Sequence, residues 1–269
     1  MLFQQSDDRR HPRPPRVRQP DRPPLPPNHR PHARPAETQR SRTERQRLLT
    51  TSLATAQKVA DTQAGPISEA GQALGSAIAS GRQIWAFGTG HSHMLAEEIY
   101  FRAGGLAGVR PVLEPSLMLH EGPEKSSELE RLTGLADVLL NTHPVTAGDI
   151  VIVASNSGRN AVPVEFAAGA RERGAIVIAI TSMAHAEAVA SRVPDGRKLY
   201  QVADIVIDNC GIPGDACIPV EGTEHRTGAT STVTGALIIQ AIVCEAVAAL
   251  RQKGVDVPLL RSNNLDPES

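Results

Sequence analysis

The first segment that could do chemistry is GTGHSH (residues 88–93), which follows a predicted strand and precedes a predicted helix. Glycine lets the backbone approach an anion closely, and the first turn of a helix presents free N–H groups with a partial positive charge. The pattern therefore predicts an anion-binding loop. A dinucleotide loop fits less well because His93 stands where its third glycine belongs, and no lysine completes a P-loop. The residues predicted to bind the anion are Gly88, Thr89, Gly90, His91 and Ser92.

A second segment of the same kind, SNSGRN (155–160), follows another predicted strand. Its hydroxyl and amide groups beside a glycine would form a compact phosphate cradle, although the same composition also suits a plain turn with a helix cap. Two such loops in one sheet indicate a small anionic ligand held between them. In GATST (228–232), Ser231 is either a helix cap or a further ligand. The residues of the second segment predicted to bind the ligand are Ser155, Asn156, Ser157 and Asn160.

Ionisable side chains follow the first loop and the second predicted strand. Glu97 and Glu98 lie in a predicted helix, where successive side chains point about 100° apart, so only one can face the strand ends squarely. His120 and Glu121 stand side by side and could act as a general acid and base. The predicted catalytic residues are Glu98, Glu97, His120 and Glu121. A His-x-His pair in a loop is too unspecific to indicate zinc, and we expect no metal or other cofactor.

Alternating strands and helices must position these residues. Strands are predicted at 83–88, 109–114, 149–155, 175–181 and 203–209. Helices are predicted at 92–103, 126–140, 161–173, 184–191 and 231–252, after an N-terminal helical region interrupted at Gly65 and Pro66. This alternation predicts an α/β fold with a doubly wound, five-stranded parallel sheet of flavodoxin-like order and an N-terminal helix. Ligands of such sheets bind beyond the carboxyl ends of the strands. We expect residues 210–224 to be a loop that acts as a lid or dimer contact.

Charge is divided unevenly along the chain. Residues 1–47 carry a net charge of +7 and the remainder −8, although the whole chain carries only −1. Residues 1–42 are rich in Arg and Pro with almost nothing apolar to bury, so we predict a disordered tail followed by one domain at 43–265. An acidic domain does not attract phosphodiester backbones, and we expect no nucleic-acid partner.

The cysteines and the hydropathy of the chain indicate the cellular compartment. The three cysteines lack the spacing of a disulfide framework or a zinc knuckle, and Cys244 is predicted to lie in the core. No unbroken apolar run of about eighteen residues indicates a membrane span, and no apolar N-terminal segment indicates secretion. We therefore expect a cytoplasmic protein without a membrane partner.

The two loops resemble the phosphosugar-binding loops of the SIS (sugar isomerase) domain family, with GTGHS after the first predicted strand and SNSG after the third. The resemblance extends over about residues 45–265 and tightens in four longer motifs. These motifs are GTGHSHMLAEEIYFRAGG, PSLMLHEG, SNSGRNAVP and GATSTVTGA. They are similar to a stand-alone SIS group that includes N-acetylglucosamine-6-phosphate dehydratase.

The resemblance implies a lyase that dehydrates N-acetylglucosamine 6-phosphate, a phosphorylated amino sugar, across C2–C3 and assembles as a homodimer or homotetramer. AEE (96–98) is similar to the AEEL segment of phosphoheptose isomerase, which implies that Glu98 is the base. Family members often have Thr or Ser where Asn156 stands, so Asn156 would contribute only its amide or backbone N–H, and His225 receives no role. The alternatives are an aldose–ketose isomerase and a non-catalytic phosphosugar sensor, because nothing in the sequence separates these activities.

Overall fold

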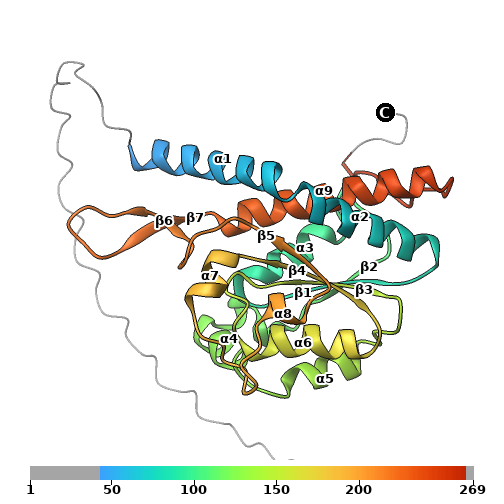
Figure 1. Cartoon of the computed structure of the whole chain (residues 1–269), viewed down its shortest axis with the longest axis horizontal. Coiled ribbons are helices and arrows are strands. Elements are labelled where there is room, and N and C mark those ends of the chain that lie inside the picture. Colours follow the sequence, from blue (N-terminus) through green and yellow to red (C-terminus); the bar gives the residue numbers. More distant parts are fainter. Residues whose placement is uncertain (1–42, 265–269) are drawn as a thin grey trace, which may run out of the picture. The chain divides into compact units, whose positions relative to one another are not determined.

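Five short aliphatic runs form one parallel sheet in the computed structural model, which describes residues 43–264 (Figure 1). The strands are β1 (Ile84–Gly88), β2 (Val109–Val112), β3 (Ile150–Ala154), β4 (Ile176–Thr181) and β5 (Ile205–Asp208). Their order is β2-β1-β3-β4-β5, and every neighbouring pair is parallel. The predicted doubly wound sheet of flavodoxin-like order is confirmed. The tail predicted at 1–42 lies outside the described residues.

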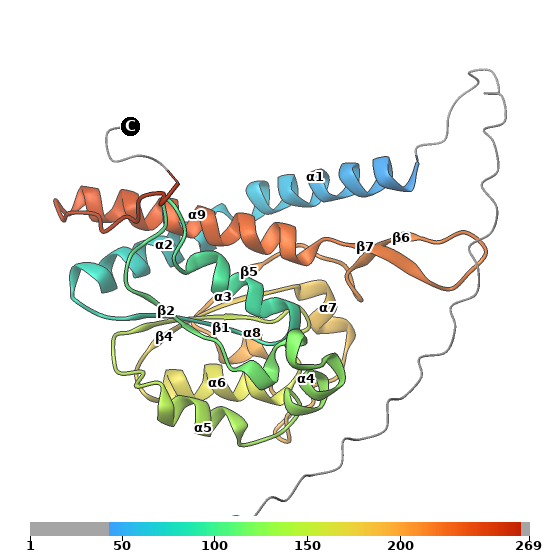
Figure 2. The same cartoon turned by 180° about the vertical axis from the view of Figure 1, so that it is seen from behind.

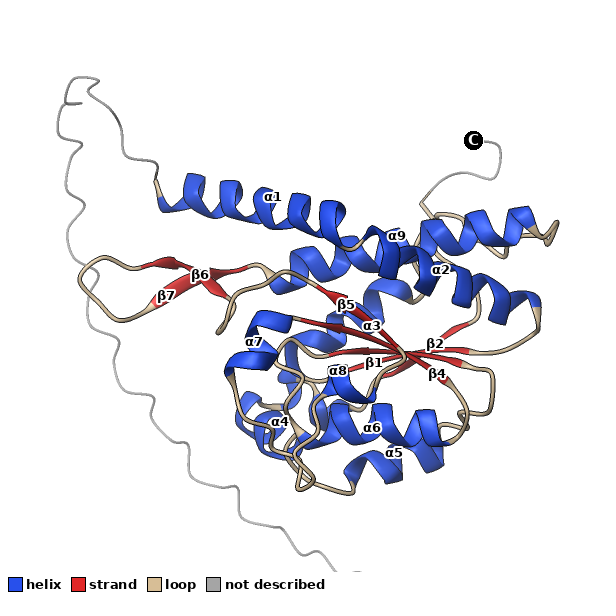
Figure 3. Ribbon diagram, in the orientation of Figure 1, coloured by secondary structure: helices blue, strands red, loops and turns tan. Residues whose placement is uncertain are grey.

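Helices cover both faces of this sheet (Figure 3). The helices are α1 (Glu44–Thr62), α2 (Ala64–Ala79), α3 (His93–Ile99), α4 (Pro123–Leu129), α5 (Leu135–Thr142), α6 (Ala161–Glu172), α7 (Met183–Ala188), α8 (Leu199–Val202) and α9 (Ser231–Gln252). Alternate side chains of each strand point to opposite faces. Ile84 and Ile152 therefore pack with α2, α3 and α9, whereas Phe87 and Val153 pack with α5, α6 and α8. The β1 and β3 strands are buried along their whole length, as parallel strands covered on both faces should be.

The topology brings the two predicted loops together. The β1 strand lies between β2 and β3, so the strand order reverses there, and Gly88 stands opposite Ala154 in the register. The chain leaves both strands at the same edge of the sheet. This edge is the switch point at which open α/β sheets bind ligands.

Helix boundaries differ from prediction at three places. The N-terminal helical region is two helices that break at Gln63, with Pro66 in the first turn of α2, where a missing N–H is tolerated. The α3 helix ends at Ile99 rather than 103, because Tyr100 is extended. The predicted helix 126–140 is interrupted between α4 and α5, where Gly134 adopts a left-handed φ of +82°.

Residues 210–224, predicted to be a loop, contain part of a β-hairpin. The β6 strand (Ala216–Pro219) pairs antiparallel with β7 (Arg226–Ala229), outside the main sheet. The hairpin and α1 extend to the same side of the described domain (Figures 1 and 2). Leu48 of α1 packs over Gly228, because a Cβ there would lie 2.8 Å from Leu48 Cδ1. Gly and Pro residues and short exposed strands concealed this hairpin in the sequence.

The α9 helix packs closely along α2. A Cβ added at Gly71 would lie 2.2 Å from Glu245 Cβ, and one at Gly75 would lie 2.8 Å from Ala249 Cβ, so the glycines permit the close approach. By length and composition alone α9 could cross a membrane, but half of its apolar window is buried in the domain, as in a core helix. The prediction that Cys244 lies in the core is wrong, because this residue is on the exposed side of α9.

Candidate functional site

A small cavity lies at the carboxyl ends of β1 and β3, with about 280 Å³ of empty space that is partly open to solvent. Its lining comes from six places in the fold and combines hydroxyl, amide and imidazole groups with an apolar base. The lining residues are His91, Ser92, Leu95, Ala154, Ser155, Asn156, Ile180, Asn209, Ser231 and Thr232. Five of the residues predicted to bind a phosphosugar are therefore brought together: His91, Ser92, Ser155, Asn156 and Ser231. No lysine or arginine is part of this lining.

The first loop (residues 88–93) folds back sharply on itself. A Cβ at Gly88 would lie only 2.4 Å from the carbonyl oxygen of Ser92, so a larger residue cannot occupy this position without moving the loop. Gly90 has a φ of +55° and begins a 3₁₀ turn, η1 (Gly90–Ser92), that leads into α3. The His93 ring, mostly buried, hydrogen bonds through Nδ1 to the carbonyl of Gly90. Gly88 and Gly90 thus shape the loop but do not line the cavity.

The second loop (residues 155–160) holds its first serine in a defined orientation. The Gly158 N–H donates to Ser155 Oγ at 3.2 Å, and the Gly158 carbonyl accepts from the Leu199 N–H at 2.9 Å. Because the Ser155 oxygen accepts from its own loop, its hydroxyl proton is available to a group in the cavity. Ser157 is half-buried and does not line the cavity.

Asn156 and Asn209 form the side of the cavity toward β5. Asn209 Nδ2 donates to Asn156 Oδ1 at 2.9 Å, and Asn209 Oδ1 accepts from the Gly211 N–H at 2.8 Å. This arrangement leaves the Asn156 amide N–H₂ as the donor group. Asn209 and Thr232 also line the cavity but were not predicted to do so, although Asn209 follows a strand directly, as the other loop residues do.

Of the two roles that the sequence left open for Ser231, the helix-cap role is wrong, because Thr230 is the N-cap of α9 and no side chain of the segment caps the helix. Ser231 lines the cavity, and its hydroxyl donates to Asp215 Oδ2 at 2.6 Å. Asp215 Oδ1 also accepts from the backbone N–H groups of Thr230 and Ser231 at 3.0 and 2.9 Å. The Asp215 carboxylate therefore occupies the free amides at the N-terminus of α9, where a negative charge is favoured.

Thr89 and Asn160, both predicted to bind the ligand, contact the partly buried carboxylate of Glu130 instead. Thr89 Oγ1 donates to Glu130 Oε2 at 2.7 Å, and Asn160 Nδ2 donates to Glu130 Oε1 at 2.5 Å. Both side chains are nearly inaccessible, at 6% and 7% exposed. Burial raises the pKa of the Glu130 carboxyl, although the Thr89 hydrogen bond and the charges of Arg131 and Arg192 oppose this effect. No motif in the sequence marked Glu130.

The four predicted catalytic residues lie outside the cavity lining. Glu97 Oε2 is 3.8 Å from His93 Nε2, and the His93 ring stands edge-on to His120 with 6.2 Å between centroids. Glu98 pairs with Arg102 and accepts from Gln240 Nε2 of α9 at 2.9 Å. Glu121 pairs with Lys125 at 3.1 Å, with both side chains largely exposed. The structure thus brings Glu97 and His120 together around His93 but separates them from Glu98. Among residues 43–264, no three His, Cys, Asp or Glu side chains gather as a metal cluster.

Two basic side chains, His185 and Arg159, lie beside the second loop. His185 Nδ1 is 3.4 Å from Asn156 Nδ2. Burial lowers the pKa of the His185 imidazole; the positive charge of Arg159 lowers it further, and Asp215 opposes both. Arg159 Nε is buried and has no partner among the described residues.

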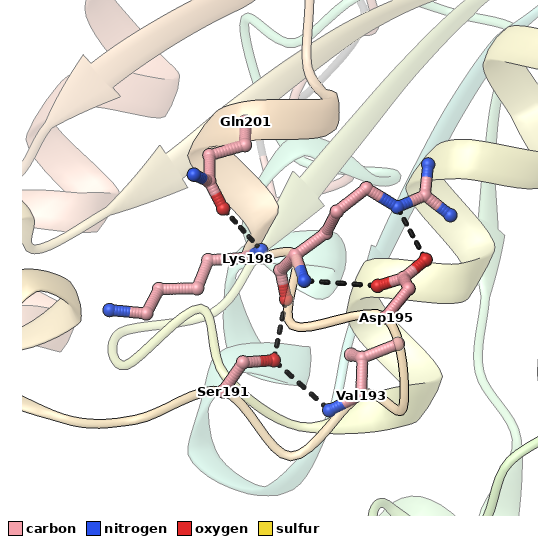
Figure 4. A network of polar contacts seen from close by, with 6 residues as sticks. Ser191, Val193, Asp195, Lys198 and Gln201 are labelled. Atoms are coloured by element: carbon pink, nitrogen blue, oxygen red, sulfur yellow. Dashed lines mark hydrogen bonds and ion pairs between the residues drawn. The ribbon is translucent and has the colours of Figure 1, made fainter.

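The segment between α7 and α8 is braced by its own polar contacts (Figure 4). Ser191 Oγ donates to the carbonyl of Arg197 at 2.6 Å, and Asp195 accepts from the backbone and guanidinium of Arg197 at 2.9 and 2.6 Å. Within this segment the Arg192 N–H donates to the carbonyl of Arg159 at 2.8 Å. The bracing therefore holds Arg192 beside the second loop.

Comparisons with known proteins agree with this architecture. A family model described as the SIS domain matches residues 49–182. A UPF0309 protein of Halalkalibacterium halodurans is 46% identical over 209 residues, covering 78% of this chain and 86% of that protein. A UPF0309 protein of Listeria innocua is 41% identical over 210 residues, covering 78% and 85%. Phosphoheptose isomerase from Neisseria gonorrhoeae shares the fold, with a TM-score of 0.51 at 19% identity over 77% of this chain and 100% of that one. The chain belongs to the SIS-domain family, in the group of UPF0309 proteins.

Proposed function

We propose that this protein is a phosphosugar lyase that dehydrates N-acetylglucosamine 6-phosphate across C2–C3. The observation that carries the proposal is the convergence of the first loop, the second loop and the N-terminus of α9 on one cavity. The hydroxyl and amide donors that line this cavity suit a phosphate group, because hydrogen bonds to a charged acceptor are strong. Membership of the SIS-domain family favours a phosphosugar over other phosphorylated compounds.

The phosphate would bind at the strand ends. The Ser92 and Ser155 hydroxyls and the Asn156 amide would donate to its oxygens, with Ser231 at the far side. Gly88 and Gly90 would keep the backbone close enough to contribute N–H groups. No lysine or arginine lines the cavity, so the phosphate would be held chiefly by hydrogen bonds from hydroxyl and amide groups. This remote binding would orient the sugar for the reaction.

The reaction would be an elimination from the open-chain sugar. Its aldehyde at C1 acidifies the C2–H, and the Glu98 carboxylate would remove that proton. The C2–H electron pair becomes the C2=C3 double bond as the C3–O bond breaks. His120 or Glu121 would protonate the departing hydroxyl, which leaves as water. Each acid–base contribution is typically worth about 10²–10⁴-fold in rate. Glu97, beside His93, is the alternative base.

The test follows the sugar by NMR. The purified protein is incubated with N-acetylglucosamine 6-phosphate in D₂O, together with Glu98→Gln, Glu97→Gln and His120→Asn variants. We expect loss of the H3 signal and growth of an olefinic signal, which Glu98→Gln abolishes while phosphosugar binding persists. Glu124→Gln is the matched control, because Glu124 is an exposed carboxylate of α4 outside the cavity.

Other outcomes would assign a different function. Deuterium at C2 without elimination would identify an isomerase or epimerase that shares the first proton abstraction. Saturable binding without any change in the sugar would identify a sensor. Full turnover in all three site variants would remove the catalytic assignments and leave only the phosphate loops.

We further propose a cytoplasmic homodimer or homotetramer. The α9 helix is apolar on its exposed side as well as on its buried side, with Val233 and Leu237 each 50% exposed. A helix that is apolar all round is normally buried, so a second copy of the chain is the expected cover. All three cysteines are free thiols, which suits a reducing compartment.

A further inference from the structure

The Glu130 carboxylate contacts both ligand loops at once. Its Oε2 accepts from Thr89 in the first loop and its Oε1 accepts from Asn160 in the second. The backbone adds a third connection, because the Glu130 carbonyl accepts from the Val162 N–H of α6 at 3.0 Å. Glu130 is the C-cap residue of α4. It therefore connects α4 to the loop after β1 and to the start of α6.

The contacts define the orientation of Asn160. Its Oδ1 accepts from Arg192 Nη1 at 2.8 Å while its Nδ2 donates to Glu130. The Asn160 amide therefore lies between the Arg192 guanidinium and the Glu130 carboxyl group. In the reverse orientation its oxygen would face the carboxyl oxygen and its N–H₂ would face the guanidinium, and both contacts would be unfavourable. Thr89 is constrained similarly, since its hydroxyl must donate to the ionised carboxylate. Each loop thus donates one side-chain hydrogen bond to Glu130, close to its cavity-lining residues.

The stability of the fold does not favour ionisation of the Glu130 carboxyl group. Burial raises the pKa of Glu130 above its ordinary value of 4.5. A carboxyl group with a raised pKa in the folded protein binds its proton more tightly there than in the unfolded chain. Its contribution to stability is therefore complete only below the pKa of the unfolded chain, and it is lost as the pH rises through the raised pKa. Ionisation of Glu130 in the folded protein therefore costs folding free energy. The charges facing it are Arg131 on its own segment and Arg192, with Glu128 acting on Arg192.

We propose that Glu130 is a positioning residue that sets the spacing of the two phosphosugar loops across the switch point. It does not line the cavity and would act through Thr89 and Asn160. The expected effect on ligand binding rests on the proposed function. The contacts of Glu130 with both loops, which we call the Glu130 bridge, can be tested without a ligand.

The binding test uses the full chain with N-acetylglucosamine 6-phosphate and inorganic phosphate as calorimetric probes. We expect Glu130→Ala to weaken binding of both by about 10–100-fold, because small displacements of positioning groups have effects of that order. Glu130→Gln can still accept from Asn160 and donate to Thr89 Oγ1, so it should bind within about threefold of the wild type. Glu128→Gln is the matched control, since it removes an exposed carboxylate of the same helix that contacts neither loop.

A double-mutant cycle separates positioning from general destabilisation. Thr89→Val removes the hydroxyl at nearly constant volume. If Glu130 acts through Thr89, the binding effects of Thr89→Val and Glu130→Ala are non-additive, because both remove the same contact. Additive effects, or wild-type affinity in Glu130→Ala, would overturn the inference.

The ligand-free test follows backbone amide signals by ¹H–¹⁵N NMR. Glu130→Ala should shift the Gly90 and Gly158 signals, one in each loop, while Glu128→Gln shifts neither. A shift in only one loop would contradict the bridge. If the wild type binds neither probe but both glycine signals move, the proposed function fails and the positioning role stands.

Discussion

At the scale of single residues, the cavity depends on side chains that accept a hydrogen bond from the protein and keep a donor group for a ligand. Ser155 accepts from the Gly158 N–H and retains its proton, and Asn156 accepts from Asn209 through its amide oxygen. The Asn156 amide nitrogen contacts His185 Nδ1 at 3.4 Å, which leaves one of its two N–H groups available. Each donor is therefore oriented before a ligand arrives. Donors oriented in advance bind an anion without a further entropic cost of ordering.

Ser155→Ala should weaken the binding of N-acetylglucosamine 6-phosphate by about 10–100-fold. The reason is that a hydrogen bond to a charged group contributes about 1.5–3 kcal/mol. Isothermal titration calorimetry measures the change. Ser127→Ala on α4 is the control, since Ser127 is half-buried outside the cavity, and equal affinity of the two variants would contradict the assignment.

Gly88→Ala should both destabilise the protein and reduce phosphosugar affinity. The new Cβ would lie 2.4 Å from the Ser92 carbonyl oxygen, so the first loop must move, at a cost of about 1–3 kcal/mol. Urea unfolding measures this loss. Gly65→Ala is the matched control, because no atom lies within 4 Å of its Cβ position in α2 and the change should stabilise by about 0.5–1 kcal/mol. An unchanged unfolding midpoint in Gly88→Ala would disprove the close contact.

At the scale of elements, the strands that carry the loops are joined at their other end by Asp149. Its carboxylate is 1% exposed and accepts from the Gln83 N–H at 3.0 Å, Trp85 Nε1 at 3.2 Å and the Thr146 N–H at 2.9 Å. Burial alone would raise the pKa of Asp149, but these hydrogen bonds lower it below its ordinary value. One carboxylate thus connects β1 to the turn before β3.

Asp149→Asn should lower the free energy of unfolding at pH 7 by about 1–3 kcal/mol, because an amide N–H₂ would replace one carboxylate oxygen and would face N–H groups that are themselves donors. The wild-type pKa is depressed, so the stabilisation is present above the ordinary value of 3.8 and is lost as pH falls through the lower folded value. The difference from wild type in urea unfolding should therefore shrink at acid pH. Asp256→Asn, on an exposed aspartate, is the control. A pH-independent difference would refute the role of ionisation.

At the scale of the whole molecule, α9 connects the cavity to the exposed surface. Its N-terminus contributes Ser231 and Thr232 to the cavity, its middle holds Glu98 through Gln240, and its outer side exposes Val233, Leu237 and Cys244. Association through this side would place a neighbouring subunit close to the site.

Leu237→Glu should shift the protein toward monomers in analytical ultracentrifugation, because a carboxylate would be buried without a partner in the interface. Val138→Glu on α5 is the control, since Val138 is 57% exposed on the opposite helical layer. A monomeric wild type, or an unchanged sedimentation coefficient for Leu237→Glu, would contradict association through α9.

The fold class and the positions of both loops along the chain follow from local sequence patterns. Aliphatic runs such as IVIVA (150–154) are buried on both faces, and glycine, serine and asparagine at their ends give turns with free donors. Parallel strands bring their carboxyl ends to one edge, so local patterns sufficed to bring the two loops together at that edge.

Only the tertiary structure decided which of these side chains meet the cavity and which meet each other. Glu130 is 41 residues from Thr89 and 30 from Asn160, and Asn209 is 53 from Asn156, so no local pattern records their contacts. The hairpin and the break at Gly134 likewise depend on packing and on one left-handed glycine. The physical reason is that periodicity reports which face of an element is buried, whereas hydrogen bonds between distant residues depend on how the elements pack.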